Sequence, residues 1–360
     1  MRNTTWKIKT SNQNKSIMLN NFPIDQDILK ILHSRGIVSK KDIINFLDPS
    51  LDNIQPSSLL SDMKKSVDLI IECINNGKNI WIYGDYDVDG ITSTSILYLA
   101  LKDLGAEFLN YYIPIRDEGY GLNNTALKTI KNSGADLLIT VDCGITSFKE
   151  IEFAKSIGLD VIITDHHDIQ SDKIPNAYSI INPKRTDNAF TFNALAGVGV
   201  AFMLILNLYE KLKTKEEAYV YLDLVAIGTI ADIVPLVKEN RIFAKHGLEK
   251  LLYSENKGLR FLITKLFETA KLEFTTYDVG FVIAPVFNAA GRLKDAKMVV
   301  KLLTSDNDRE IEVISKELIN KNFERRELQT TLVELVEANI QKNNLNDNLV
   351  IVDASSEYHH

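Results

Sequence analysis

Acidic side chains are concentrated in one short segment of this sequence, the hexapeptide DYDVDG at 85–90. The hexapeptide directly follows NIWIYG (79–84), an apolar stretch that predicts a short buried strand. A dinucleotide-binding turn would place the glycine pattern G-x-G-x-x-G here, and this chain places three carboxylates instead. Carboxylates at this spacing repel one another unless a cation neutralises them or water solvates them all. The segment is therefore either a solvated acidic turn or part of a cation site.

Two more expected strands end in side chains that bind metals. The strand ITVD ends at Asp142, and the strand IITD ends at Asp165, which His166 and His167 follow. In an open α/β sheet the carboxyl ends of parallel strands form one edge, and ligands bind there. Asp232, in GTIADIVPL, follows an apolar helical segment. A lone aspartate there usually caps a helix, but beside a carboxylate cluster we interpret it as a metal ligand.

Many carboxylates with one or two imidazoles suit Mn²⁺ or Mg²⁺, and the nitrogen ligands favour Mn²⁺. The excess of carboxylates predicts two ions that share a bridging carboxylate. Such two-metal sites hydrolyse phosphoesters. Zinc stays an alternative ion, although a zinc module rich in cysteine is excluded, because the chain has only Cys73 and Cys143.

The elements that must position these residues alternate between helix and strand from about residue 61 onward, which predicts an α/β fold with a parallel sheet flanked by helices. Four strands are expected, at 79–84, 107–113, 135–142 and 159–165. The whole chain is predicted to comprise an N-terminal helical extension (1–60), a catalytic domain (61–240), a helical completion of that lobe (241–305), a long connecting helix (306–345) and the start of a further domain (346–360).

The composition limits the remaining classes of function. Hydrophobic residues make up 45% of the 360 residues and charged residues 25%, which is typical of a globular protein. The net charge of −7 argues against a broad basic surface. No apolar run reaches the roughly 18 residues that span a bilayer, and the N-terminus lacks the apolar core of a signal peptide. We therefore expect a cytoplasmic protein without a membrane partner.

At this point the motifs resemble a known family. YGDYDVDG, VDCG, TDHH and GTIADIVPL, in this order, are similar to the four motifs of the DHH phosphoesterases. The segments IPIRDEGYGLN, NPKR, LAGVGVAF and FNAAGRL extend the resemblance to the RecJ family of bacterial single-strand-specific 5′→3′ exonucleases. The resemblance implies a metal-dependent exonuclease of DNA repair and recombination, acting on single-stranded DNA with a single-strand-binding protein and a helicase as partners. It also implies that a second lobe, named DHHA1, begins at 346–360.

The same resemblance assigns roles to individual residues. Asp87 and Asp89 would each hold an ion, Asp142 would bridge both, and His166 and Asp232 would complete the shell of the second ion. Two further residues would act in catalysis: His167 would donate to the scissile phosphate, and Asp85 would ligate an ion or orient a neighbour. Arg116 and Arg292 would bind the substrate by contacting its phosphates. Tyr83 replaces a histidine ligand of many relatives, and we leave it out of the metal set because a phenol binds Mn²⁺ poorly.

Two alternatives remain open. A smaller-substrate DHH phosphodiesterase would cut oligoribonucleotides or cyclic dinucleotides, but it would share only the four motifs. A non-catalytic replication scaffold of the DHH fold would have lost acidic ligands, all of which stand in this sequence. Gly197 and Gly199 in LAGVGVAF either let the backbone approach a ligand or serve helix packing, and the apolar residues on both sides favour packing.

Overall fold

The structure is a computed structural model that describes residues 24–170, 173–292 and 296–342. The chain divides into two compact units between Ile54 and Gln55. The first unit contains two short helices, α1 (Gln26–Ser34) and α2 (Lys40–Leu47), and the 3-10 turn η1 (Leu51–Asn53). A small core of three residues holds it together: Leu29, Leu32 and Ile43. These helices confirm the helical character expected near the N-terminus.

The second unit is built on a five-stranded sheet with the order β2-β1-β3-β4-β5, in which every pair of neighbours is parallel. The strands are β1 (Ile80–Gly84), β2 (Leu109–Tyr112), β3 (Leu137–Val141), β4 (Asp160–Thr164) and β5 (Ser179–Ile181). The first four confirm the predicted strands. The fifth was not predicted, because three residues are too few to show a periodic pattern.

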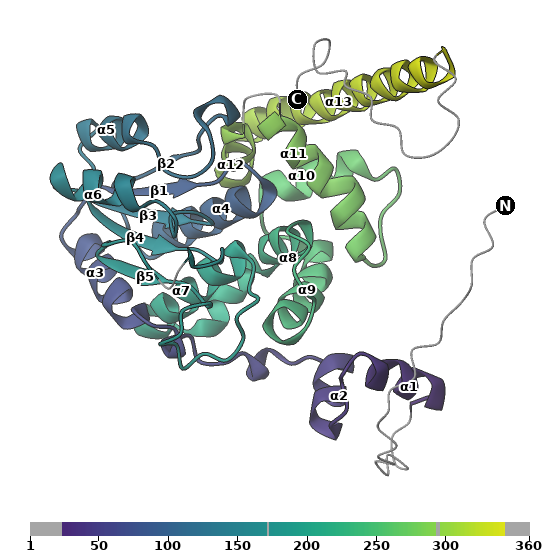
Figure 1. Cartoon of the computed structure of the whole chain (residues 1–360), viewed down its shortest axis with the longest axis horizontal. Helices are drawn as coiled ribbons and strands as arrows, with labels where there is room; N and C mark the ends of the chain where they lie inside the picture. The colour runs from purple at the N-terminus through teal and green to yellow at the C-terminus, as the bar shows by residue number, and fades with distance from the viewer. Residues whose placement is uncertain (1–23, 171–172, 293–295, 343–360) are drawn as a thin grey trace. The chain divides into compact units, whose positions relative to one another are not determined.

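Helices cover both faces of this sheet (Figure 1). On one face, α5 (Asn124–Asn132) and α6 (Phe148–Ser156) bury their apolar residues against the strands. On the other face lie α4 (Val88–Asp103) and α7 (Gly197–Leu212), and α8 (Leu222–Ala231) packs against both of these helices. The helix α7 is buried on all sides over its first 13 residues, which explains its nearly continuous apolar sequence.

The remaining helices extend this α/β body. Besides short 3-10 turns, they are α3 (Met63–Asn75), α9 (Lys238–Lys250), α10 (Lys257–Leu266), the π-helix η7 (Asp278–Ile283), α11 (Ala284–Arg292), α12 (Lys297–Thr304) and α13 (Asp308–Lys342). The helix α13 confirms the long helix predicted over 306–341. Its connecting role and the domain boundaries within this unit stay predictions. The further domain expected at 346–360 also stays a prediction, because that segment lies outside the described residues. Among the helices that are described, none is long and apolar enough to cross a membrane.

The strand order creates one natural opening for a ligand. The chain leaves β1 for α4 on one face of the sheet and leaves β3 for α6 on the other. Where neighbouring parallel strands send their connections to opposite faces, a crevice opens beyond their carboxyl ends. The acidic segment at 85–90 and Asp142 lie directly at this point.

Candidate metal centre

The acidic turn after β1 is held by its own backbone. Asp87 caps α4, and its Oδ1 accepts the N–H of Gly90 at 3.0 Å. A Cβ on Gly90 would lie 2.5 Å from the carbonyl oxygen of Asp85, so only glycine allows this close turn. Asp89, which sequence reasoning placed at the end of the strand, is in the first turn of α4 and is almost completely buried.

The start of α7 brings two of the carboxylates together. The backbone N–H groups of Gly197 and Val198 donate to the two oxygens of Asp89, at 2.6 and 2.7 Å. A Cβ on Gly197 would lie only 2.5 Å from Oδ1 of Asp142. Helix packing, the expected reason for both glycines of this segment, is therefore wrong for Gly197, which makes room for a carboxylate. It holds for Gly199, where a Cβ would meet a leucine side chain at 3.3 Å.

His166 presents a lone pair to the carboxylate of Asp142. The Nδ1 of His166 lies 3.0 Å from the carbonyl oxygen of Leu195, which can only accept, so Nδ1 carries the proton. In the neutral ring the other nitrogen, Nε2, is then an acceptor, and it lies 3.1 Å from Oδ1 of Asp142. That Oδ1 is buried without a hydrogen-bond partner in the described part of the chain. Two such atoms at this distance fit either a proton held by Asp142 or a cation that both ligate.

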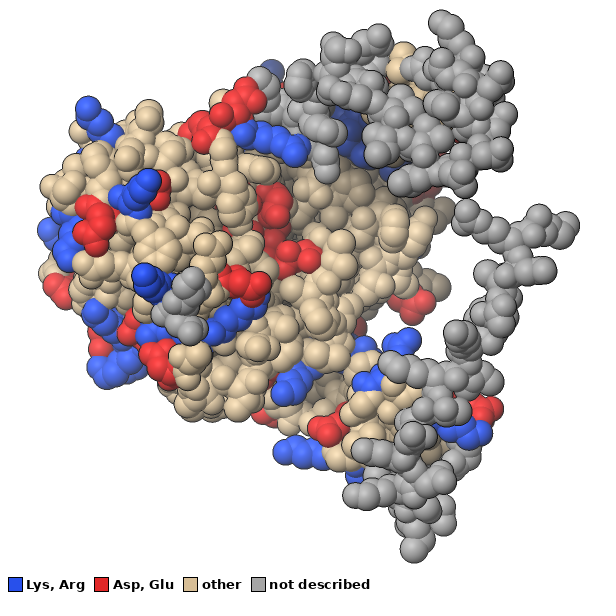
Figure 2. All heavy atoms as spheres, in the orientation of Figure 1, with Lys and Arg blue, Asp and Glu red and all other residues tan. Residues whose placement is uncertain are grey.

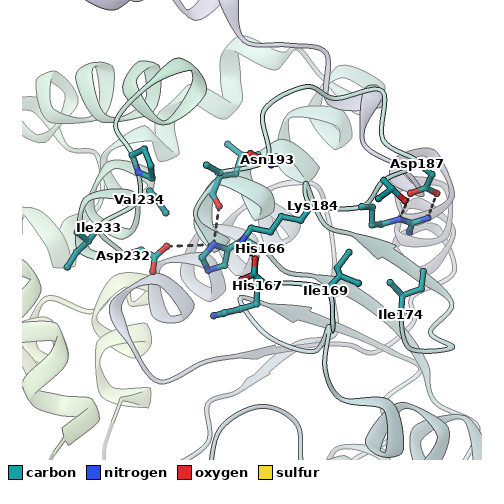
Figure 3. A pocket seen from close by; sticks show the side chains of 16 residues that line it. His166, His167, Ile169, Ile174, Lys184, Asp187, Asn193, Asp232, Ile233 and Val234 are labelled. Carbon is teal, nitrogen blue, oxygen red and sulfur yellow. Dashed lines mark hydrogen bonds and ion pairs between the residues drawn. The ribbon is translucent and has the colours of Figure 1, made fainter. Parts of the chain in front are cut away.

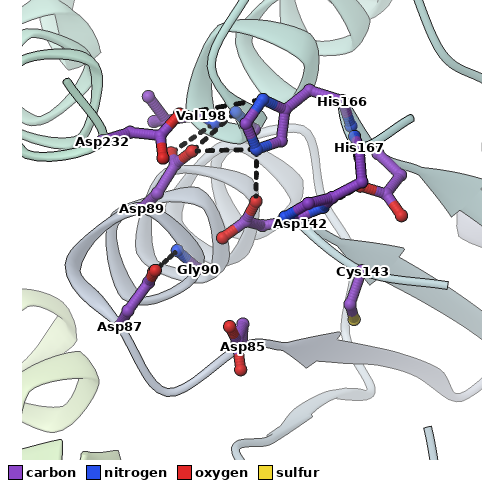
Figure 4. A network of polar contacts seen from close by, with 12 residues as sticks. Asp85, Asp87, Asp89, Gly90, Asp142, Cys143, His166, His167, Val198 and Asp232 are labelled. Atoms are coloured by element: carbon purple, nitrogen blue, oxygen red, sulfur yellow. Dashed lines mark hydrogen bonds and ion pairs between the residues drawn. The ribbon is translucent and has the colours of Figure 1, made fainter. Parts of the chain in front are cut away.

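Further carboxylates complete the cluster (Figure 4). Oδ2 of Asp89 lies 3.9 Å from Nε2 of His166, and Oδ2 of Asp232 lies 3.7 Å from Nδ1 of the same ring. Asp232 ends α8 as its C-cap, and its Oδ2 is also buried without a hydrogen-bond partner among the described residues. Potential ligand atoms lie within 4.8 Å of one another in three overlapping groups: Asp85, Asp87 and Asp142; Asp89, His166 and Asp232; and Asp142, His166 and His167.

Burial and mutual repulsion perturb the acids of this cluster. Burial, followed by the charge of Asp87, raises the pKa values of Asp85 and Asp89 to about 7. Burial and the nearby Asp89 raise the pKa of Asp232 to about 7 and that of Asp142 well above its ordinary range. Carboxylates crowded into a dry crevice keep protons that a divalent cation would otherwise replace. The donor set, with oxygens and one imidazole nitrogen, fits Mn²⁺ or Mg²⁺.

His167 occupies a different environment from His166. Its Nδ1 lies 2.7 Å from Oδ1 of Asp165, and this hydrogen bond raises the pKa of His167. The buried Asp165 also accepts the backbone N–H groups of Ile145 and of both histidines, so it holds the whole loop. Nε2 of His167 lies 2.9 Å from the hydroxyl of Tyr120.

Asp165 was recognised in the sequence as the end of a strand but was given no role, and Tyr120 was not predicted to lie at the site. Asp165 is the first residue beyond a buried strand, and this position could have indicated a role at the site. For Tyr120 no spacing pattern indicated a contact, because it lies in a loop 47 residues before His167.

Tyr83 does not face the cluster. Its side chain is fully buried, and its hydroxyl donates to the carbonyl oxygen of Gly121 at 2.9 Å. The ring stacks on that of Tyr112 with centroids 5.3 Å apart, in the core between the sheet and α5. Burial raises the pKa of the phenol, which keeps it neutral.

Of the two arginines expected to contact phosphate, the structure describes the side chain of Arg116 but not that of Arg292. Arg116 is half-buried in the 3-10 turn η3 (Arg116–Glu118), in the same loop as Tyr120. Arg292 is the last residue of α11, and its side chain lies outside the described structure. A Cβ on Gly291 would lie 2.7 Å from the carbonyl oxygen of Tyr86, so the end of α11 touches the acidic turn. Both phosphate contacts stay predictions.

A cavity of about 910 Å³ adjoins the metal centre (Figure 3). His166, His167 and Asp232 lie on its inner wall, and Lys184 and Asn193 add polar groups. The wall also includes apolar side chains, among them Ile169, Ile174, Ile233 and Val234. In Figure 2, acidic side chains gather in a hollow at the centre of the visible face, while most lysines and arginines lie toward its edges. The acidic hollow suits cations, and the cavity beside the metal centre also carries the cationic side chains of Lys184 and Arg185.

Comparisons with known proteins agree with this geometry. Residues 79–229 match the model of the DHH family, N-terminal domain. The chain is 37% identical to the single-stranded-DNA-specific exonuclease RecJ of Bacillus subtilis (strain 168), over 96% of this chain and 43% of that protein. A crystal structure of exonuclease RecJ bound to manganese is 36% identical, with a TM-score of 0.70 over 76% of this chain and 69% of that one.

A second solved structure, RecJ from Thermus thermophilus in complex with Mn²⁺, is 33% identical with a TM-score of 0.71, over 84% of this chain and 42% of that one. The chain thus spans about half the length of the curated relatives it matches.

Proposed function

Because this chain belongs to the RecJ family of DHH proteins, we propose that it is a metal-dependent exonuclease that hydrolyses single-stranded DNA from the 5′ end. The observation that carries the proposal is the pair of facing acceptors, Nε2 of His166 and Oδ1 of Asp142, 3.1 Å apart. A buried pair of this kind is satisfied by a proton on Asp142 in the metal-free protein or by a cation that both atoms ligate, and the further carboxylates around it favour the cation. The substrate is proposed from the relatives, which are named single-stranded-DNA-specific exonucleases. The polarity of digestion is proposed from the resemblance of the motifs alone.

The proposed ligands of two divalent ions are the residues of the cluster. Asp87 and Asp89 would each hold one ion, Asp142 would contact both, and His166 and Asp232 would complete the shell of the second ion; Asp85 would ligate or orient its neighbours. When bound, such ions polarise the phosphoryl oxygen and lower the pKa of a bound water. The backbone donors to Asp89 and the carbonyl that fixes the tautomer of His166 hold these ligands in place before ions arrive.

His167 is proposed to protonate the leaving oxygen. Its hydrogen bond to Asp165 raises the pKa of His167, which favours the protonated form of the ring. Its side chain is 41% exposed, so a substrate can reach it, whereas that of His166 is only 11% exposed. In the described state Nε2 of His167 contacts the hydroxyl of Tyr120, and a substrate oxygen would take that place.

The wider setting is proposed on the family alone. Single-stranded DNA would be the substrate in DNA repair and recombination, with a single-strand-binding protein and a helicase as partners. We propose the cytoplasm as the location, and the two unpaired, buried cysteines are compatible with its reducing conditions. A non-catalytic scaffold is disfavoured, because the acidic residues that such a protein could lose are all present and their ligand atoms lie close together.

The test is digestion of labelled nucleic acids by the purified chain. Single-stranded DNA labelled at the 5′ or 3′ end, duplex DNA and a short oligoribonucleotide are each incubated with Mn²⁺ or with chelator. The proposal expects Mn²⁺-dependent release of nucleotides from the 5′ end of single-stranded DNA. Faster cleavage of the oligoribonucleotide would instead favour a small-substrate phosphodiesterase, and absence of hydrolysis of every substrate with bound Mn²⁺ would favour a scaffold.

A further inference from the structure

Ile233 has a backbone conformation that its side chain makes unfavourable. It follows Asp232, the C-cap of α8, and its φ is +61°, in the left-handed region. Helices that end in this way usually carry glycine or asparagine at this position. A β-branched residue is a genuine outlier there, because its Cβ crowds the backbone.

Packing within the described chain does not compensate for this conformation. Ile233 is 88% exposed, so its side chain buries little apolar surface. Its backbone N–H donates to the carbonyl oxygen of Ile230 at 3.3 Å, a bond that glycine or asparagine would make equally well. An exposed isoleucine therefore occupies a position at which both the end of the helix and contact with water would favour glycine or asparagine. Strain of this kind, where neighbouring structure maintains it, is concentrated at functional sites.

The position of Ile233 indicates what its side chain meets. It lies at the edge of the cavity beside the metal centre, beyond Asp232 as seen from His166 (Figure 3). A phosphate bound at His166 and His167 would place the next part of the strand at this edge. The only large apolar groups of a DNA strand are its bases, and apolar side chains such as isoleucine can pack against their faces.

We propose that Ile233 is a substrate-positioning residue that packs against the nucleobase flanking the scissile phosphate. This inference rests on the proposed nuclease function. The left-handed backbone directs the isoleucine outward from the end of α8, while the preceding Asp232 is directed toward His166. One turn thus places a proposed metal ligand and a proposed base contact on adjacent residues.

The test compares three variants in steady-state hydrolysis of a single-stranded oligodeoxynucleotide with Mn²⁺. Ile233→Asn suits the left-handed backbone and removes the apolar contact, so KM should rise roughly tenfold while Mn²⁺ affinity is unchanged. The same variant should melt a few degrees higher, because asparagine relieves the strain. Ile233→Leu keeps an apolar side chain and should keep KM within about twofold. Leu272→Asn, which removes a leucine that is 94% exposed and does not line this cavity, is the matched control.

A strand with an abasic residue on either side of the scissile phosphate identifies the group that Ile233 touches. If the contact is with the base, the penalty of Ile233→Asn disappears for one of the two abasic strands. A penalty that persists with both strands, or an unchanged KM in an active protein, overturns the role of Ile233 while the proposed function stands. A wild-type protein that binds Mn²⁺ but hydrolyses no DNA overturns both.

Discussion

Replacing Gly197 by alanine tests whether the start of α7 positions the bridging carboxylate. A Cβ at this position would lie 2.5 Å from Oδ1, 2.7 Å from Cβ and 2.8 Å from Cγ of Asp142, whereas ordinary contacts begin at 3.4 Å. Either Asp142 or the helix must therefore move by about 0.9 Å, and a misplacement of that size costs on the order of 100-fold in rate. Gly197→Ala should lower kcat/KM for single-stranded DNA by about that factor.

Gly199→Ala is the matched control, since it makes the same chemical change two residues later in the same helix. Its Cβ would meet the Cδ2 atom of Leu195 at 3.3 Å, which a shift of a few tenths of an ångström relieves. Its activity should stay within about twofold of the wild type. The assay is Mn²⁺-dependent release of nucleotides, accompanied by Mn²⁺ calorimetry and thermal melting for both variants.

The two variants separate positioning from general damage. If Gly197→Ala melts no lower than Gly199→Ala but loses activity and Mn²⁺ affinity, the displaced carboxylate is the cause. A folded Gly197→Ala protein with wild-type activity and Mn²⁺ affinity would refute the reasoning, because Asp142 would then tolerate displacement or would not hold metal.

Three further outcomes are expected. Asp142→Asn should keep the fold but lose nearly all hydrolysis, even at saturating Mn²⁺, because it removes charge that two cations share; near-normal activity would exclude the bridging role. For the metal-free protein, Asp85, Asp89 and Asp232 have pKa values raised to about 7, so the folded state binds more protons than the unfolded state. Its stability should therefore fall as the pH rises from about 4 to 7, and Mn²⁺ should remove much of that fall in melting experiments. Asp165→Asn weakens the interaction that raises the pKa of His167, so the alkaline limb of the activity profile should move to lower pH; an unmoved limb would argue against His167 as the acid.

Local patterns in the sequence were sufficient for the elements and for most of the candidate site. Apolar runs separated by helical segments predicted four of the five parallel strands, because a strand buried on both faces is continuously apolar. Acids and imidazoles at the carboxyl ends of β1, β3 and β4 must then meet at one edge. The predicted cluster follows from this rule, and the structure brings Asp89, Asp142, His166 and Asp232 together.

Other features depended on contacts between distant parts of the chain. The protonated nitrogen of His166 is set by a carbonyl 29 residues away, and Asp89 receives its backbone donors from residues more than 100 positions later. The sequence carries no periodic signal for such contacts. Gly197 was assigned to helix packing for the same reason. Its neighbours in the sequence are apolar, and they do not show whether the glycine faces a helix or a carboxylate.

The residue types and their positions at strand ends determined that this protein would gather carboxylates and imidazoles at one edge of a parallel sheet. Only the tertiary structure decided which nitrogen of His166 faces Asp142, that Tyr83 turns into the core, and that Ile233 takes a left-handed backbone at the edge of the cavity. The physical reason is range: strand and helix patterns arise from residues a few positions apart, whereas tautomers, close approaches and strained turns are imposed by groups that meet only after the chain has folded.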